Sequence, residues 1–258
     1  MIGRAGSLSV NRLIPNERLV VLLAGFPAGS FGTNCFVAAS GPGERCLVID
    51  PGQDAVTELD AILDKHRLTP GAVLLTHGHL DHTWSVVPVC GARDIPAYIH
   101  PADRAMLTDP LKGLSSAFGA MIANMPVGEP DEVRELPDNG VLEVAGLSLS
   151  VSLAPGHTPG SVVFGTEDGG PDEQPVLFSG DLLFAGSIGR TDFPGGSFPD
   201  MIASLARIVL PLADDTLVLS GHGPATTIGR ERASNPFLHQ AAAETGTPLM
   251  APPKGRGL

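Results

Sequence analysis

The stretch Thr76-His77-Gly78-His79-Leu80-Asp81-His82 places four ionisable side chains within six positions. The sequence has only eight histidines in 258 residues, so three of them in one short loop are unusual. The preceding run Ala72-Val73-Leu74-Leu75 is short, bounded and aliphatic, which is typical of a buried strand. We therefore expect these histidines in a loop that leaves the carboxyl end of a strand.

The residue types in this loop are those that bind metal ions. Imidazole and carboxylate groups are ligands of Zn²⁺ and of similar borderline ions. On an extended backbone the alternate side chains His77 and His79 point the same way. Asp81 and His82 follow where the chain turns, so they can point to a second place. This one loop can therefore contribute to two adjacent metal sites.

Three further ligand candidates share one kind of sequence context. His157 lies in Ala154-Pro155-Gly156-His157-Thr158-Pro159-Gly160, Asp181 ends Leu177-Phe178-Ser179-Gly180-Asp181, and His222 lies in Val218-Leu219-Ser220-Gly221-His222-Gly223. Each follows an apolar run and is flanked by glycine, as at a strand that ends in a tight turn. Any one of them alone would fit a structural role, but the shared context favours a single site.

These motifs, in this order, resemble the metallo-β-lactamase superfamily. Upstream, Leu47-Val48-Ile49-Asp50-Pro51-Gly52 is similar to the family's first motif, in which an aspartate closes an early strand. Within the superfamily the chain is similar to the short glyoxalase II-like (hydroxyacylglutathione hydrolase-like) hydrolases, which share residues 32–36, 186–196 and 223–229. The resemblance implies an α+β fold, an αββα sandwich with the metal site at one edge of the two sheets.

The resemblance also implies how the ligands divide between two divalent metal ions. One ion would bind His77, His79 and His157, the other Asp81, His82 and His222, and Asp181 would bridge them. Zinc is the expected metal, with iron and manganese as alternatives. Two such ions can share a hydroxide and polarise a substrate carbonyl, and Asp81 is expected to orient that hydroxide.

The implied reaction is hydrolysis of a small-molecule thioester, formed by a 2-hydroxy acid and a low-molecular-weight thiol. Long glyoxalase II enzymes carry a helical C-terminal domain that helps to hold glutathione. Only 36 residues follow His222 in this sequence. The thiol carrier therefore stays open between glutathione, another low-molecular-weight thiol and neither of these.

Residues beside the expected ligands have two interpretations each. Arg190 follows Asp181 by nine residues and suits forked recognition of a substrate carboxylate. It equally suits an internal contact with Asp192 or Asp181 that shapes the loop. Asp50 either orients a ligand histidine or caps the end of its strand. We expect Asp50 and Asp192 to support the site without binding the metal themselves.

Other functions compete with thioester hydrolysis. A persulfide dioxygenase of the same superfamily uses mononuclear iron and also shows a Gly-Arg-Thr-Asp-Phe run, as at residues 189–193. Its final histidine typically leads into Asp-Tyr, whereas Gly223-Pro224 follows His222, which favours the hydrolase. A β-lactam or lactone hydrolase uses the same motifs, although a β-lactamase would normally be exported. The complete ligand set disfavours a binding module without activity.

Composition narrows the class of partner. The formal net charge is −12, and no run of Lys and Arg suggests a nucleic-acid interface. No apolar run reaches the roughly 18 residues of a membrane span, and the N-terminus lacks the apolar core of a secretory signal. We therefore expect a cytoplasmic enzyme that binds neither nucleic acid nor membrane. The odd cysteine count without a CxxC motif predicts buried, reduced thiols at Cys35, Cys46 and Cys90.

The predicted organisation is an N-terminal segment at 1–17 with little order, a single domain at 18–245 and a Gly/Pro-rich tail at 246–258. Apolar periodicity predicts strands at residues 19–23, 31–39, 46–49, 72–75, 97–99, 141–144, 147–153, 161–165, 176–178 and 217–219. It predicts helices at residues 54–65, 101–107, 198–209 and 236–244, and one that begins within 83–87. Residues 109–140 show no clear pattern and fit a mobile cover or a loosely packed connector equally.

Overall fold

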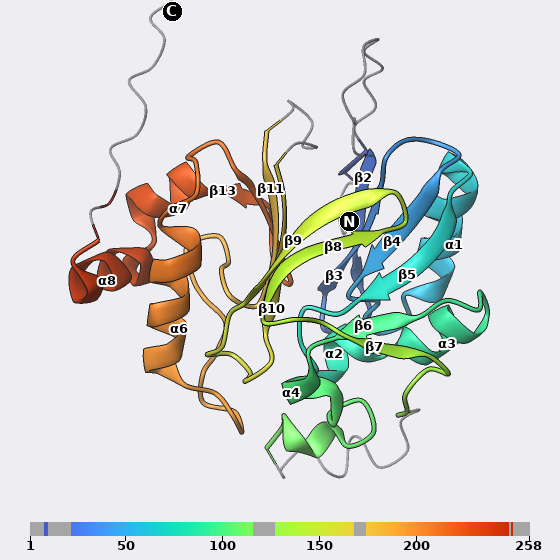
Figure 1. The fold of residues 1–258 in the computed structure, drawn as a ribbon, viewed down its shortest axis with the longest axis horizontal. Coiled ribbons are helices and arrows are strands. Elements are labelled where there is room, and N and C mark those ends of the chain that lie inside the picture. Colours follow the sequence, from blue (N-terminus) through green and yellow to red (C-terminus); the bar gives the residue numbers. More distant parts are fainter. Residues whose placement is uncertain (1–7, 10–21, 116–126, 168–173, 248, 250–258) are drawn as a thin grey trace, which may run out of the picture.

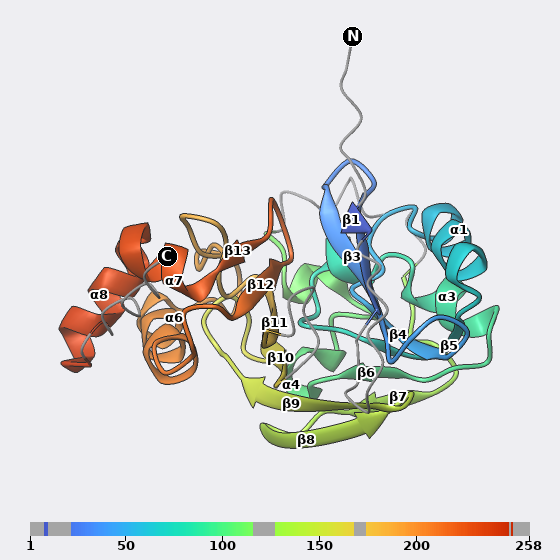
Figure 2. The same cartoon turned by 90° about the horizontal axis from the view of Figure 1, so that it is seen from above.

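A computed structural model describes residues 8–9, 22–115, 127–167, 174–247 and 249 of the chain. Two sheets pack face to face at its centre, and helices cover the outer face of each sheet (Figure 1). The view from above shows the same order of layers, with α1 and α3 on one outer side and α6 to α8 on the other (Figure 2). The predicted αββα sandwich of an α+β protein is therefore confirmed.

The first sheet has seven strands in sequence order, from β1 to β7. Neighbouring strands are antiparallel from β1 to β4 and parallel from β4 to β7. The strands are β1 (Leu8–Ser9), β2 (Leu22–Ala28), β3 (Thr33–Ala39), β4 (Arg45–Ile49), β5 (Thr69–Leu74), β6 (Ala97–Ile99) and β7 (Val133–Glu135). The helices of this half are α1 (Val56–His66), α2 (Leu80–Thr83), α3 (Val86–Gly91), α4 (Pro101–Arg104) and a 3-10 turn at Pro110–Lys112.

The second sheet has six strands in the order β13-β12-β11-β10-β9-β8. Only β11 and β12 run parallel, and the other neighbours are antiparallel. The strands are β8 (Asn139–Val144), β9 (Leu147–Leu153), β10 (Val162–Thr166), β11 (Val176–Gly180), β12 (Leu217–Ser220) and β13 (Thr226–Thr227). The helices are α6 (Phe198–Ser204), continued by a π-helix at Leu205–Val209, then α7 (Ile228–Ser234) and α8 (Pro236–Thr245).

Three apolar cores hold these layers together. On β4, Cys46 and Val48 face the helices α1 and α3, whereas Leu47 and Ile49 face the second sheet. Successive side chains of a strand point to opposite faces, so a strand covered on both faces is apolar throughout. The Phe36 ring of β3 meets a ring from β11 across the two sheets, with 5.7 Å between centroids. A third core lies between the second sheet and helices α6 to α8.

This topology brings the candidate ligands to one edge. Parallel strands β4 and β5 end in Asp50 and in the loop that begins at Thr76, and parallel strands β11 and β12 end just before Asp181 and His222. Carboxyl ends of neighbouring parallel strands meet at the same edge of a sheet. His157 joins them from the loop between β9 and β10.

Four predicted elements are wrong in their bounds by three residues or more. Strand β5 begins at Thr69, three residues before the predicted start, and helix α4 ends at Arg104, three residues before the predicted end. Strand β2 extends to Ala28, well beyond the predicted end at residue 23. The helix predicted to begin within residues 83–87 is two short helices, α2 and α3. The break falls at Ser85, whose N–H donates to Pro51 O at 2.9 Å and so leaves the helical pattern. Strands β7 and β13 and helix α7 were not predicted.

The predictions for the two ends of the chain lie largely outside the described residues. The same holds for residues 116–126 within the unpatterned stretch 109–140. All three cysteines are free and buried, as predicted, and burial raises the pKa of Cys46 and of Cys90 to about 12. Over the described ranges, no helix is both long and apolar enough to cross a lipid bilayer.

Candidate metal centre

All seven predicted ligands lie together at the edge of the sandwich. In three overlapping groups, the nitrogen and oxygen atoms that could bind a metal lie within 4.8 Å of one another. The groups are His77 with His79 and His157, His77 with His82 and Asp181, and Asp81 with His82 and His222. The four loops that supply them are far apart in sequence, so the fold itself assembles the cluster.

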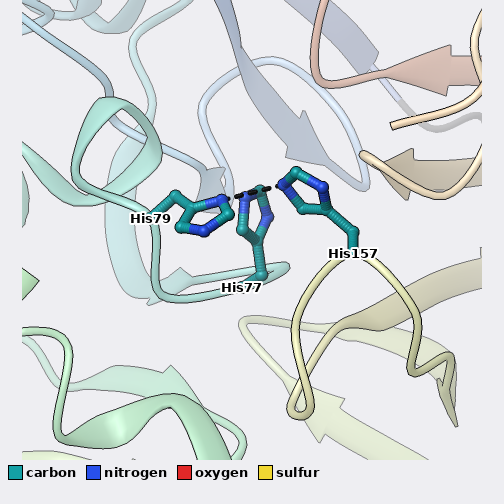
Figure 3. Close-up of side chains that lie close together, drawn as sticks. All are labelled: His77, His79 and His157. Atoms are coloured by element: carbon teal, nitrogen blue, oxygen red, sulfur yellow. Dashed lines mark hydrogen bonds between the residues drawn. The ribbon is translucent and has the colours of Figure 1, made fainter. Parts of the chain in front are cut away.

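The first group, called here the three-histidine group, consists of His77, His79 and His157, whose rings lie close together (Figure 3). His79 Nδ1 lies 2.8 Å from His157 Nε2, and all three rings of the group are buried. His157 Nδ1 donates to the carbonyl oxygen of Arg190 at 2.7 Å, which leaves its Nε2 lone pair directed at the cluster. His77 Nε2 is buried without a hydrogen-bond partner among the described residues. A metal ion would satisfy this otherwise costly lone pair.

The second group, called here the open group, consists of Asp81, His82 and His222. His82 Nε2 lies 3.3 Å from His222 Nε2 and 3.5 Å from an oxygen of Asp81. The same oxygen of Asp81 accepts a hydrogen bond from Thr33 Oγ1 at 3.0 Å. The His82 side chain is fully buried, but those of Asp81 and His222 are 22% and 29% exposed. This group therefore faces the outside of the site.

Asp181 lies between the two groups. One of its oxygens is 3.4 Å from His82 Nε2, and the other is 3.4 Å from His157 Nε2 and 3.7 Å from His222 Nε2. Its Oδ1 is buried and has no hydrogen-bond partner among the described residues. A carboxylate in this place can bind one ion with each oxygen, which is the arrangement predicted for the bridging residue.

Charge in the cluster favours a cation at its centre. Burial disfavours a charge on His82, yet the carboxylates of Asp81, Asp181 and Asp50 raise its pKa well above the usual value. Burial and, to a smaller extent, the imidazole of His157 lower the pKa of His79 to about 3. Neutral imidazole is the form that binds metal. The carboxylates thus favour positive charge at His82, which a divalent cation could supply in place of the proton, and His79 offers a neutral nitrogen.

Asp50 supports the open group through a hydrogen bond with His82. Its carboxylate accepts hydrogen bonds from Thr76 N at 2.8 Å, from Thr76 Oγ1 at 2.6 Å and from His82 Nδ1 at 2.9 Å. A carboxylate in this position fixes the tautomer of a ligand histidine and raises its basicity. Asp50 therefore orients His82, the first of its two interpretations, while it also ties the start of the ligand loop to β4.

Arg190 makes the internal contact foreseen as its second interpretation. Its Nε and Nη2 donate to the two oxygens of Asp192 at 2.7 and 2.8 Å, and its guanidinium carbon lies 3.6 Å from the ring centroid of Phe193. The arginine side chain is 52% exposed. Its contact with a substrate carboxylate stays a prediction.

A cavity of about 490 Å³ lies beside both groups and is lined by two side chains of each. Its walls are largely apolar, and Arg190 is the one Arg or Lys among the described residues that line it. The lining residues are Phe31, His79, Leu80, Asp81, Leu114, His157, Asp181, Phe184, Ser187, Ile188, Arg190, Phe193 and His222.

Sequence reasoning missed two parts of the site. It missed the hydrogen bond from Thr33 to Asp81, because only the fold brings β3 beside the ligand loop. Thr33 itself lies within residues 32–36, which resemble the glyoxalase II-like hydrolases. It also missed the cavity wall, since Phe31 and Phe184 look like ordinary apolar residues in the sequence.

Comparisons with known proteins agree with this geometry. Residues 28–222 match the model of the metallo-beta-lactamase superfamily. An uncharacterized protein of Mycobacterium tuberculosis is 48% identical over 219 residues, which are 84% of this chain and 98% of that protein. The hydroxyacylglutathione hydrolase GloC of Haemophilus influenzae is 35% identical over 83% of this chain and 96% of its own length.

Solved structures give the same family. The B3 metallo-beta-lactamase BLEG-1 is 38% identical, with a TM-score of 0.72, over 84% of this chain and 99% of its own. The protein TTHA1623, solved in a di-iron-bound form, is 35% identical, with a TM-score of 0.68, over 83% of this chain and 99% of its own. The chain belongs to the metallo-beta-lactamase superfamily.

Proposed function

We propose that this member of the metallo-beta-lactamase superfamily hydrolyses the thioester of a 2-hydroxy acid and a low-molecular-weight thiol, with two divalent ions, preferably zinc. The observation that carries the proposal is the position of Asp181 between the three-histidine group and the open group. A site for one ion needs only one carboxylate oxygen, whereas both oxygens of Asp181 face histidines of different groups, as a carboxylate shared by two ions requires. The relative named hydroxyacylglutathione hydrolase supports the choice of a thioester.

The two groups would each hold one ion. His77, His79 and His157 would bind the first, and Asp81, His82 and His222 the second. Bound there, divalent ions would polarise the substrate carbonyl and provide a nucleophile at neutral pH.

Asp81 is placed to direct the attacking water. It lies at the cavity wall, where one carboxylate oxygen already accepts from Thr33 Oγ1. Burial acts to raise the pKa of Asp81, but His82 and His222 outweigh burial and hold that pKa below the usual value. Asp81 is therefore a carboxylate at neutral pH, and it can orient the attacking water by accepting a hydrogen bond from it.

The departing group explains why the site needs no separate general acid. A thiol has a pKa near 8.5, so a thiolate departs without being protonated first. The apolar cavity wall formed by Phe31, Phe184 and Ile188 suits the carbon skeleton of such a thioester.

Hydrolysis of a β-lactam is the second candidate. It is favoured by the 38% identity to a protein named as a B3 metallo-beta-lactamase. The same carbonyl chemistry would open a lactam ring, but the leaving amide nitrogen then has to gain a proton. None of the cavity-lining residues described is a Lys or Tyr that could give one.

One experiment separates these functions. The protein, purified with sufficient zinc, is given a lactoyl thioester, a cephalosporin and a glutathione persulfide in parallel. Thiol release, ring opening and oxygen consumption are measured, together with the metal content. The Asp181→Asn variant, prepared in the same way, is the control for activity that does not come from this site.

The proposal expects fast thiol release, close to two zinc ions per chain and little activity on the other two substrates. Ring opening that exceeds thiol release would establish the β-lactam alternative. Oxygen consumption together with one firmly bound iron ion would establish the persulfide dioxygenase instead.

A further inference from the structure

Asp103 is a buried carboxylate for which the proposed chemistry has no use. It lies in the short helix α4, and its exposed fraction is 0%. Burial raises the pKa of Asp103, while three hydrogen-bond donors act against that rise. A buried carboxylate is costly unless such donors satisfy it, so their identity shows what it is used for.

The donors come from two loops that both carry metal ligands. Gly78 N, between His77 and His79, donates to Asp103 Oδ2 at 2.9 Å. Thr158 Oγ1, next to His157, donates to the same oxygen at 2.5 Å. Gly160 N donates to the other oxygen, Oδ1, at 2.7 Å. One carboxylate thus joins a loop of the first sheet to a loop of the second.

Close approach to Asp103 explains the glycines in both ligand motifs. A Cβ atom on Gly160 would lie 2.7 Å from the Asp103 carboxyl carbon. A Cβ atom on Gly78 would lie 2.8 Å from the Asp103 carbonyl oxygen and 3.0 Å from Met106. Real Cβ atoms do not come this near, so each loop can reach Asp103 only if glycine stands at that position.

We propose that Asp103 is a positioning residue that sets the spacing of the three-histidine group, and thereby its affinity for metal. His79 Nδ1 and His157 Nε2 lie 2.8 Å apart although their loops belong to different sheets. Gly78, which stands between His77 and His79, and Thr158, which follows His157, donate to the same oxygen of Asp103, so this carboxylate links the two loops beside their histidines. The proposal concerns metal binding and holds whichever bond the site cleaves.

The open group has a separate link of its own, which supplies a matched control. Asn34 N donates to Gly221 O at 2.7 Å, and Asn34 Nδ2 donates to Ser220 O and Gly223 O, both at 2.9 Å. These bonds hold the loop of His222 against strand β3. Asp103 therefore ties two ligand loops together, whereas Asn34 ties the loop of His222 to β3, so loss of either should affect a different group.

The test follows single imidazoles during a zinc titration. Protein labelled with ¹⁵N-histidine is titrated at defined free zinc, and nitrogen resonances are assigned by single histidine substitutions. Zinc content at each point is measured independently. The variants are Asp103→Asn, which replaces one acceptor by a donor of nearly the same size, and Asn34→Ala as the control.

For Asp103→Asn we expect the resonances of His79 and His157 to respond only at about 10- to 100-fold higher free zinc, the usual effect of removing a supporting residue. The response of His222 should stay at the original zinc concentration. Asn34→Ala should give the reverse pattern. Equal shifts at both groups, or no shift at His79 and His157, would overturn the proposal and leave Asp103 as a general stabiliser of the fold.

A milder pair of variants keeps the test decisive if Asp103→Asn does not fold. Thr158→Val removes one donor and keeps the carboxylate, so it should shift the response of His157 in the same direction by a smaller factor. Thr158→Ser retains the hydroxyl and should restore the original response. Failure of the serine variant to restore it would show that packing of the Thr158 methyl group, not the link to Asp103, controls the site.

Discussion

The three-histidine group and the open group differ in enclosure and in what supports them. The first is made of three buried imidazoles, and His157 is held by a backbone carbonyl. The second contains a carboxylate, and His82 is held by the carboxylate of Asp50. Two side chains of each group line the cavity, but Asp81 and His222 of the open group have exposed fractions above 20%, whereas His79 and His157 are buried. Under the proposed function, the first group would keep its ion and the second would present its ion to the substrate.

This difference predicts unequal metal affinity. Removal of an ion from the three-histidine group would leave buried nitrogen atoms without partners, which is costly. Water can reach the open group and replace the lost ion there. A weak chelator should therefore remove metal in two steps, the open group first.

The largest effect is expected where the two groups meet. Asp181→Asn should lower metal occupancy at both groups, because each oxygen of Asp181 faces a histidine of a different group at 3.4 Å. Loss of a supporting residue costs about 10- to 100-fold, so loss of a shared ligand should reduce turnover by more than about 100-fold. Metal analysis and kcat measure the two effects.

Asp192→Asn is the matched control for that variant, because it removes a carboxylate that is 69% exposed and lies eleven residues further along the chain. It should leave metal content unchanged. If Asp181→Asn still holds two ions and turns over normally, the two groups do not share a ligand, and the division into two sites is wrong.

Asp81→Asn should affect metal binding at the open group alone. The amide keeps the size of the side chain but loses its charge, so the open group should lose its ion while the three-histidine group keeps its own. We expect the metal content to fall from about two ions to about one, and kcat to fall at least about tenfold. Normal activity at saturating substrate and limiting metal would exclude Asp81 from the site.

Asp50→Asn should weaken the open group without removing a ligand. An asparagine cannot accept from both Thr76 and His82 in the way that the carboxylate does. The free zinc needed to restore activity should rise by about 10- to 100-fold, with KM nearly unchanged. An equal loss of zinc from the three-histidine group would show that Asp50 acts through Thr76 and His77 rather than through His82.

The members of the cluster could be predicted from the sequence because each carries a local signal. His77 to His82 follow an aliphatic run, and Asp181 and His222 follow apolar runs that end in glycine. A strand end needs little more than such a run to be recognised. The sandwich could be predicted because those apolar runs indicate the strands, and the resemblance to a known family indicated how the strands are arranged.

The rest depends on contacts between distant residues. Strand β7 was missed because Val133, Arg134 and Glu135 are partly exposed and carry no apolar pattern. Pro27 and Gly25 interrupt the alternation of β2 and hid its true length. The roles of Thr33 and Asp103 arise only when strands and loops far apart in sequence meet, so no local pattern could reveal them.

The smallest effect is expected at Arg190, where the backbone supports a histidine and the side chain lies at the cavity wall. Its carbonyl accepts from His157 of the three-histidine group, whereas its guanidinium lies over the ring of Phe193, which also lines the cavity. Arg190→Gln should raise KM for a thioester whose thiol carries a carboxylate by about tenfold, or about 1.5 kcal/mol. We expect the low end of the range for a charged hydrogen bond, because Asp192 already occupies two of the guanidinium donors.

An uncharged thioester is the control for Arg190→Gln and should be hydrolysed about as well as before, with metal content unchanged. Asp192→Asn sharpens the comparison, since it frees the guanidinium and should lower KM for the carboxylated substrate alone. Equal losses on both substrates, with zinc lost from the three-histidine group, would give a different answer. The pair of Arg190 and Asp192 would then act by holding the loop whose carbonyl orients His157, and the cavity would recognise its substrate through its apolar wall.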